Sequence, residues 1–260
     1  DNGWMSPMPS LVRRLKFVNK RETRPIEFLK DYEIHKLFRG VKERKNKVPM
    51  RLFMALALNC GYTQADIQDL KYEHILFYKG WAHSIQKKRT KTQQPMKHTL
   101  WKSTAFMLMY YLHEHPKQDG DTIFIAQNGK PYVQLVAKQR EPDQSMTEMK
   151  IYIRDNIGNC FRRLVAKVFP TDAKGKTFRL LRKTGATTIR SISTNDSLLC
   201  EQLYLGHRPM SVARQHYTAI EIPRLDEVLL ELEKHFDLDQ YIPKRKQDYP
   251  LPPTNLYEGI

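Results

Sequence analysis

Strand-like sequence is concentrated in one stretch of this chain, residues 73–100. It contains the segments HILFY, WAHSIQ and PMKHTLW, and the turn-rich segment KKRTKTQQ separates the second from the third. Short segments of this kind, separated by turn residues, predict two or three antiparallel strands. Elsewhere the apolar residues recur mainly at helical spacing. We therefore expect a mostly α fold with one small antiparallel β-sheet, in the α+β class.

The expected helices follow from this spacing and from the residues at their ends. Pro49 suits the first turn of an apolar helix over residues 49–59, and Gly61 follows the end of that helix. Between the other helices we expect a short strand at residues 122–126 and a polar loop at residues 133–149. Further helices are expected at residues 27–39, 64–70, 102–115, about 151–169, 177–192, about 196–204, 211–219 and 223–236.

The charge of the chain points to an anionic partner. Lysine and arginine total 44 against 28 acidic residues, which gives a formal net charge of +16 and an isoelectric point near 9.7. Such an excess attracts nucleic acid, although a ribosomal or membrane-surface protein would show the same excess. The sequence contains no run of about 18 apolar residues, so we expect no transmembrane helix. The widely spaced Cys60, Cys160 and Cys200 predict reduced thiols in a cytosolic protein, without a disulfide framework or zinc site.

Three sequence motifs occur in order along the chain. The first is LALNCGYTQADIQDL at residues 56–70, the second is RLLRKTGATTI at residues 179–189, and the third is LYLGH at residues 203–207, followed by Tyr217 in RQHYT. They resemble the boxes of the tyrosine recombinase (phage integrase) family, written T-G-x-R-x-x-E-L-x-x-L, H-x-L-R-H/K-T-x-A-T and L-G-H…Y-T. The resemblance covers about residues 50–220 and implies the fold of that family's catalytic domain.

The resemblance implies DNA strand cleavage and rejoining through a 3′-phosphotyrosine. That chemistry requires a tyrosine oxygen in line with the leaving 5′-oxygen. Cations must also neutralise charge on the non-bridging oxygens, and a proton must reach the leaving oxygen. Guanidinium groups match phosphate geometry, so neither a metal nor a small-molecule cofactor is expected. The pair His113 and His115 is not expected to bind metal, because residues two apart on a helix point in different directions.

The family's roles fall on particular residues of this chain. Tyr217 matches the nucleophile, Arg182 a phosphate clamp, and His207 a hydrogen-bond donor to a non-bridging oxygen. Arg179 shares a helix face with Arg182, so both can grip one phosphate. Lys91, in the expected β-turn, matches the lysine that protonates the leaving oxygen. The alternatives are a surface arginine, a capping or core histidine, a packed aromatic ring and an ordinary turn lysine.

Other basic residues near these motifs are expected to contact the DNA backbone. The alternative to Lys91 as proton donor is Lys88. The expected DNA-binding residues are Lys87, Lys88, Arg89, Lys183 and Arg208.

The first motif departs from the family pattern. The position of its arginine falls on Thr63, with Gln64 beside it, and a threonine cannot neutralise a phosphate oxygen. Losing one such donor costs about 2.7–4 kcal/mol of transition-state stabilisation. Arg179 stands where the family has histidine or lysine, and it is a poor general acid but adds a cation. Three outcomes remain open: Gln64 or another arginine compensates, the enzyme is slow, or the domain holds DNA without cutting it.

The expected organisation is a basic arm or linker at residues 1–25, a recombinase-like catalytic domain at 26–220, a C-terminal helix at 221–240 and an extended tail at 241–260. The helix, with Leu225 to Phe236, is expected either to pack on its own domain or to be exchanged with another protomer. The expected partner is double-stranded DNA, in a cytoplasmic, nucleoid-associated protein that is a piece of a longer chain. A type IB topoisomerase-like activity, which shares the same chemistry, is a further alternative.

Overall fold

The computed structural model describes residues 27–41, 49–89, 93–115, 122–126, 128–139, 149–192, 197–207 and 218–242. Its helices are α1 (Asp31–Gly40), α2 (Met50–Asn59), α3 (Gln64–Gln68), α4 (Lys102–Glu114), α5 (Asn156–Val168), α6 (Arg179–Ile192), α7 (Ser197–Tyr204) and α9 (Thr218–Phe236), with short 3-10 turns η2 (Tyr72–His74) and η3 (Asp239–Tyr241). Its strands are β1 (Ile75–Tyr78), β2 (Trp81–Lys88), β3 (Pro95–Thr99), β4 (Val133–Gln139) and β5 (Met149–Asp155). The mostly α, α+β fold class is confirmed.

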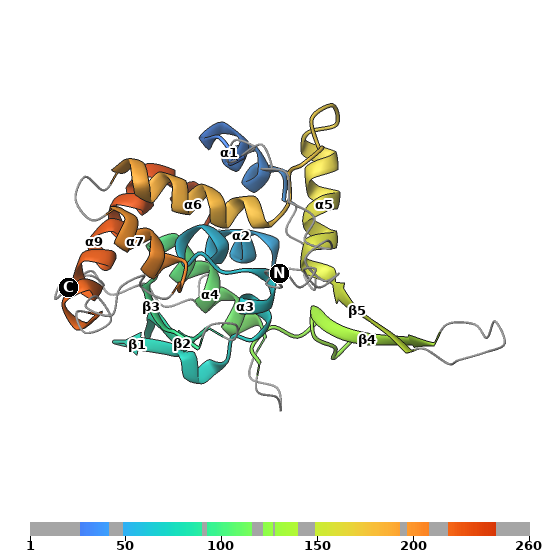
Figure 1. Cartoon of the computed structure of the whole chain (residues 1–260), viewed down its shortest axis with the longest axis horizontal. Coiled ribbons are helices and arrows are strands. Elements are labelled where there is room, and N and C mark those ends of the chain that lie inside the picture. The colour runs from blue at the N-terminus through green and yellow to red at the C-terminus, as the bar shows by residue number, and fades with distance from the viewer. Residues whose placement is uncertain are drawn as a thin grey trace, which may run out of the picture.

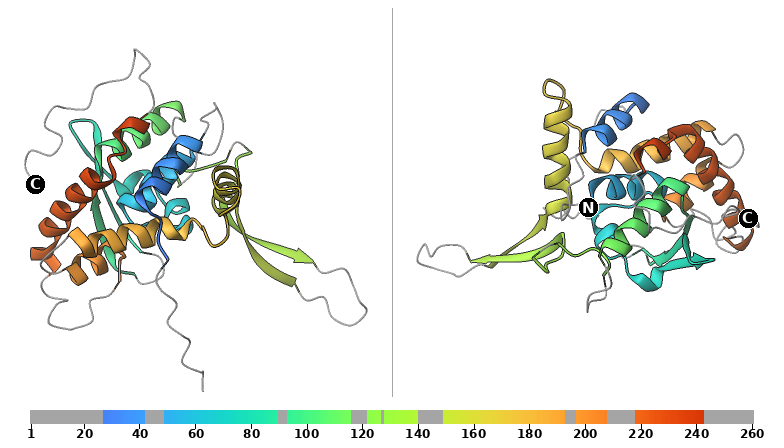
Figure 2. Two further views of the ribbon diagram at one scale, coloured as in Figure 1. Left: turned by 90° about the horizontal axis from the view of Figure 1, so that it is seen from above. Right: turned by 180° about the vertical axis from the view of Figure 1, so that it is seen from behind.

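Helix α2 is the centre of the fold. Every residue of this helix except Arg51 is buried, as expected for a helix that is apolar on all sides. It contacts α4, α5, α6 and α9, and Figures 1 and 2 show these helices arranged around it. Gly61, with a φ of 63°, turns the chain sharply after the helix, in a conformation that glycine adopts at no steric cost.

A three-stranded antiparallel sheet lies along one side of the helices (Figure 1), in the order β1-β2-β3. Ser84 to Lys88 of β2 pair with Pro95 to Thr99 of β3. The predicted strand segments are thereby confirmed, and β2 extends further into the basic turn than expected. Trp81 packs edge-on against Phe106 of α4, with 4.9 Å between ring centroids, and helps to hold the sheet on the helices.

A second pair of strands occupies the region expected to be a loop and the start of a helix. Strands β4 and β5 pair in register from Val133 with Asp155 to Gln139 with Met149, and the ribbon projects away from the body (Figures 1 and 2). The helix expected from residue 151 begins instead at Asn156, because the side chain of Asp155 accepts a hydrogen bond from the amide of Gly158 at 2.8 Å. The expectation was therefore wrong for residues 133–139 and 149–155, and residues 140–148 of the expected loop lie outside the described residues.

The prediction of a continuous strand at residues 122–126 is also wrong. Only two isolated bridges form in this segment, between Thr122 and Lys71 and between Ile125 and Pro131.

The C-terminal helix packs within its own chain. Helix α9 is continuous from Thr218, so the two separate helices expected at residues 211–219 and 223–236 are corrected, while residues 211–217 lie outside the described residues. Its side chains Leu225, Leu229, Leu232 and Phe236 are buried in the core. The arm at residues 1–25 and the tail beyond Ile242 also lie outside the described residues. Within the described part of the chain, no helix combines the length and apolar character needed to cross a bilayer.

Candidate active site

Arg182 joins the segments of all three motifs. It lies in the first turns of α6 and is 7% exposed. Its Nη1 donates a hydrogen bond to the carbonyl of Gly61, and its Nη2 donates one to the carbonyl of Leu205 at 2.7 Å. One guanidinium therefore fixes the loop after α2 against the end of α7. The surface position considered for Arg182 is wrong, because these carbonyls hold the side chain inside the fold.

Tyr204 packs against the segments that Arg182 joins. Its ring lies against Gly61, where an added Cβ would be 2.9 Å from ring carbons, and it also lies against Gly185 of α6. The Tyr204 hydroxyl lies 2.8 Å from the carbonyl oxygen of Leu58 and donates a hydrogen bond within α2. The small residues at 61 and 185 thus allow α2, α6 and α7 to meet closely enough for Arg182 to span them.

Arg89 approaches the same place from the end of β2. Its Nη1 donates to the carbonyl of Leu205 at 2.9 Å and lies 3.4 Å from that of Gly206. Burial lowers the pKa of Arg182 to about 10, and the nearby charges of Arg89 and, more weakly, Arg179 act in the same direction. The carboxylate of Asp66 raises that pKa and offsets part of this effect. The charges of two arginines and one carboxylate therefore act on Arg182. The net positive charge of the group favours binding of an anion.

Lys87 faces the interior rather than DNA. The period of two along β2 puts Ile85 and Lys87 on the buried face and leaves Lys88 exposed. The Lys87 ammonium donates to the backbone carbonyl of Asp66 at 2.9 Å and lies 5.7 Å from the ring centroid of Tyr62. Burial lowers its pKa. The expected DNA contact of Lys87 is therefore corrected to a bond that holds α3 against the sheet.

Thr63 is the N-cap of α3. Its hydroxyl donates to the Asp66 carboxylate at 2.7 Å, and its backbone amide donates to the same oxygen at 2.9 Å. The amide of Asp66 completes the capping box by donating to the Thr63 hydroxyl. The side chain of Gln64 donates to Asp155 at 3.1 Å, between α3 and the start of α5. The side chains of both residues at the degenerate arginine position are therefore hydrogen-bonded to carboxylates, Thr63 to Asp66 within α3 and Gln64 to Asp155 before α5.

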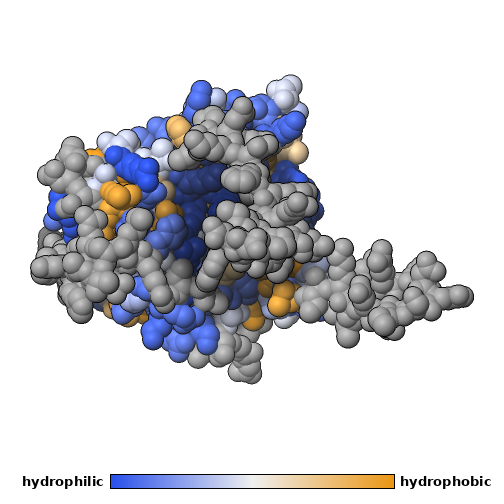
Figure 3. All heavy atoms as spheres, viewed as in Figure 1, coloured by the Kyte–Doolittle hydropathy of each residue, from blue (hydrophilic) through white to orange (hydrophobic). Residues whose placement is uncertain are grey.

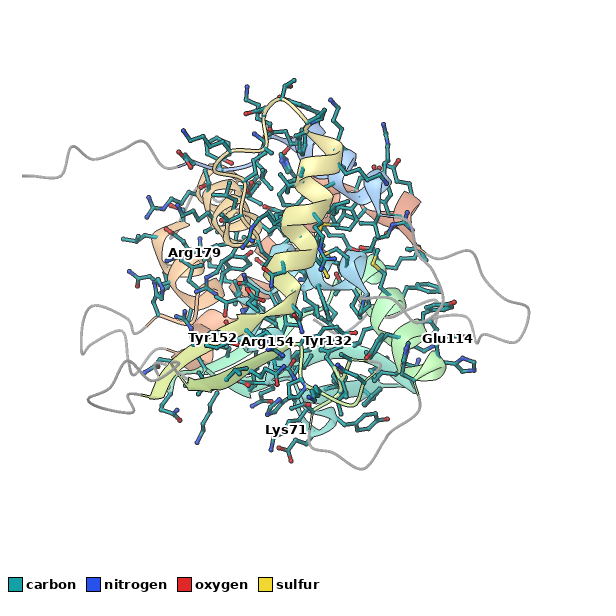
Figure 4. The ribbon with its side chains drawn as sticks, turned by 90° about the vertical axis from the view of Figure 1, so that its right-hand side faces the viewer. Lys71, Glu114, Tyr132, Tyr152, Arg154 and Arg179 are labelled. Atoms are coloured by element: carbon teal, nitrogen blue, oxygen red, sulfur yellow. The ribbon has the colours of Figure 1, made fainter. Side chains whose placement is uncertain are left out.

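The remaining expected site residues fall into two groups. His207 is exposed and follows Leu205 and Gly206 after the end of α7, and its amide donates a hydrogen bond to the carbonyl of Gln202. Lys183 is half-buried and adjoins Arg182 in α6. Arg179 is exposed at the start of α6, and Figure 4 shows it on the side of α5 where α6 lies. The expected residues Lys91, Arg208 and Tyr217 lie outside the described residues.

A comparison with protein families matches the phage integrase family over residues 27–222, which include all three motifs up to Tyr217. The chain belongs to the phage integrase family.

Solved structures show the same fold. The chain is similar to XerA recombinase, with a TM-score of 0.52 and 20% identity, over 83% of this chain and 65% of that one. It is also similar to the Tn1549 transposon integrase in complex with circular intermediate DNA, with a TM-score of 0.52 and 16% identity, over 79% of this chain and 65% of that one. The chain thus spans slightly less than two thirds of each of these two. No curated protein sequence matches the chain.

In this integrase-family fold, the sequence alone missed the contact of Arg89 with the third motif. Residues 89 and 205 are far apart in sequence, and no local pattern links them. The buried His98 was also missed: burial lowers its pKa to about 4, and its Nε2 lies 3.3 Å from the carbonyl oxygen of Tyr204. The period of two in β3 and the expected small sheet were the available signals for its inward position.

The chemistry that this arrangement supports is recognition of an anion by fixed guanidinium groups. Figure 3 shows hydrophilic side chains in those central parts of the face presented in Figure 1 that grey atoms do not cover. No group of His, Cys, Asp and Glu side chains suited to a metal ion occurs among the described residues. Arg182 and Arg89 are therefore the groups whose charge and geometry best suit a phosphate.

Proposed function

We propose that this integrase-family chain is the catalytic domain of a site-specific DNA recombinase that cuts and rejoins strands through Tyr217. The single observation that supports this most is the position of Arg182, buried where the three motifs meet and beside a second guanidinium. Burial of a charge is costly unless it is paired. Two neighbouring arginines with only partial carboxylate compensation are thus suited to hold a phosphodiester.

In the proposed reaction, the Tyr217 oxygen attacks the scissile phosphorus and the bond to the 5′-oxygen breaks. The tyrosine proton passes to solvent, and Lys91 supplies a proton to the departing oxygen, with Lys88 as the alternative donor. Arg182 and His207 donate hydrogen bonds to the non-bridging oxygens, where negative charge increases in the pentacoordinate state. Arg179 adds a further donor at the surface. Rejoining reverses these steps with the 5′-hydroxyl of a second strand as nucleophile.

The proposed partner is double-stranded DNA, with phosphate contacts from Lys88, Lys183 and Arg208. The DNA present in the Tn1549 integrase structure supports this choice. Self-association on DNA through the C-terminal segment remains part of the proposal. Because α9 is buried in its own core, exchange of this helix would require its release and re-docking on a second protomer.

The test is capture of the covalent intermediate. Full-length protein is incubated with sheared DNA of the source organism, denatured, and recovered with any attached strand, whose end is then sequenced. We expect adducts at a defined sequence, none with Tyr217→Phe, and unchanged yield with the control Tyr78→Phe, which alters an exposed tyrosine of β1. A wild-type protein that yields no adduct would exclude the cleavage reaction.

A second candidate is a module that holds DNA without cutting, favoured by the engagement of Thr63 in the capping box. It predicts duplex binding that weakens steeply with salt, without any adduct. Adduct formation by the wild-type protein excludes this candidate.

A further inference from the structure

The first motif contains no cationic side chain, and the neutral side chains of Thr63 and Gln64 are already hydrogen-bonded within the protein. Thr63 is bonded to Asp66 through both its hydroxyl and its amide, and Gln64 is bonded to Asp155. A phosphate held by Arg182 alone would lack one of the positive groups that stabilise the pentacoordinate state. The structure nevertheless places a second guanidinium within reach of the same spot.

Arg182 and Arg89 converge on one backbone oxygen. The Nη2 atom of Arg182 and the Nη1 atom of Arg89 lie 2.7 Å and 2.9 Å from the carbonyl oxygen of Leu205. Two guanidinium groups on one oxygen repel each other. Burial lowers the pKa of Arg182, and the charge of Arg89 lowers it further. An anion between the two groups would relieve that repulsion.

Arg89 retains donors for such an anion. A guanidinium carries five N–H groups. In the described part of the chain, only Nη1 of Arg89 is hydrogen-bonded, to the carbonyls of Leu205 and Gly206. Nη2 and Nε are therefore not used by described residues. The two bonds orient the planar group in advance, which lowers the entropy cost of binding a ligand.

The loop under Arg89 is shaped to receive its side chain. Gly206 has a φ of 56°, and a Cβ built at this residue would lie 3.2 Å from Cδ of Arg89 and still closer to Met96. The absence of a side chain at 206 lets the stem of Arg89 cross the loop immediately before His207. Arg89 is thus anchored next to two of the proposed phosphate ligands.

The neighbouring lysines are less suited to this role. Lys87 is buried and bonded to the Asp66 carbonyl, on the far side of the strand from the exposed Lys88. Neither carries the planar fork that can donate to a backbone carbonyl and a phosphate oxygen at once.

We propose that Arg89 is a catalytic residue of this protein, whose guanidinium neutralises a non-bridging oxygen of the scissile phosphate in place of the arginine absent at position 63. This inference rests on the proposed strand cleavage. It assigns to the β2–β3 hairpin a charge that the family pattern places at the start of α3.

The experiment compares Arg89→Ala, Arg89→Lys and the control Lys79→Gln, which removes a charge from the distant β1–β2 turn. Adduct formation is timed on the recovered DNA site, made once with the normal phosphate and once with a neutral methylphosphonate at the scissile position. On normal DNA we expect Arg89→Ala to be slower by about 10²–10³-fold and Arg89→Lys to be intermediate. On methylphosphonate, which lacks the charge to be neutralised, we expect the Arg89→Ala deficit to shrink below about tenfold.

A merely structural arginine gives a different result. If Arg89 only anchors the loop, its removal slows both substrates equally, and this outcome, or the absence of any deficit, overturns the proposal. Thermal unfolding of each variant shows whether the fold is kept, and Arg89→Lys, which retains the charge and a donor, tests the role if Arg89→Ala unfolds.

A second measurement tests Arg89 separately from strand cleavage. If the wild-type protein forms no adduct, the cleavage proposal is wrong, and anion binding then tests the role of Arg89. Binding of orthovanadate, a phosphate analogue, is then measured by vanadium NMR. Arg89→Ala should weaken this affinity by about tenfold or more, as expected for the loss of a charge-assisted bond, with Lys79→Gln unchanged. Equal affinity, or no binding by the wild type, overturns the role of Arg89.

Discussion

Gly185 of α6 lies directly against the side chain of Tyr204 of α7, and no methyl group fits between them. A Cβ at 185 would be 2.8 Å from Cζ of the tyrosine, nearer still to its hydroxyl, and 3.0 Å from the carbonyl oxygen of Leu58. Residues of α2, α6 and α7 therefore meet at this contact, the same three segments that Gly61, Arg182 and Leu205 join.

Gly185→Ala is expected to destabilise the protein although alanine favours helices. The propensity gain is about 1 kcal/mol, whereas overpacking costs about 1–3 kcal/mol, and here the neighbours are a buried ring and a backbone oxygen. Urea denaturation measures the net loss. Tyr204→Phe removes the nearest atom, so the double variant should lose less than the sum of the single variants. Strict additivity would show that residues 185 and 204 are not in contact.

Thr63→Ala should lower the free energy of unfolding by about 0.5–2 kcal/mol, because the capping oxygen of α3 is lost. Thr63→Ser keeps that oxygen and is the matched control, with a change near zero. Thr63→Arg should be as destabilising as the alanine variant, since arginine cannot accept the hydrogen bond of the Asp66 amide. Equal stability of the alanine and serine variants in urea titrations would count against the capping box.

Glu233 is expected to make the free energy of unfolding decrease as the pH rises. Burial raises its pKa to about 7, partly offset by the amides of Lys102 and Ser103 that donate to it. The folded state therefore holds the proton more tightly than the unfolded state. The stability contributed by the protonated group is present below pH 4.5 and is lost as the pH rises through about 7.

Glu233→Gln should remove this dependence, because an amide does not titrate. The difference in unfolding free energy between wild type and Glu233→Gln is expected to shift across the window from pH 4.5 to about 7. Glu231→Gln, at an exposed position of the same helix, is the control and should follow the wild type. A constant difference across that window would refute the raised pKa.

The sequence predicted the parts of the fold that depend on local signals. Helix α2 has Pro49 before it and Gly61 after it, and its apolar residues leave no side exposed. The three strands of the first sheet were separable because turn residues divide them. Arg182 and the LGH segment were expected at one site, and the backbone carbonyl of Leu205 brings them together.

The parts that were missed depend on contacts between distant residues. The β4–β5 ribbon exposes Leu135 by 73% and Ile153 by 65%, so it lacks the buried face on which a strand prediction relies. The burial of Arg182 and the inward position of Lys87 depend on carbonyls supplied by other segments. Thr63 and Asp66 are spaced three residues apart, as in a capping box, so the sequence contained a local signal for this N-cap. The prediction for position 63 considered only the arginine of the family pattern.

The capping box also limits how this protein can change by mutation. A single codon change that placed arginine at 63 would deprive Asp66 of the hydroxyl it faces, and the helix start that also carries Gln64 would loosen. A cation gained at position 63 would therefore come at the expense of the N-terminus of α3, where the same residue now begins the helix.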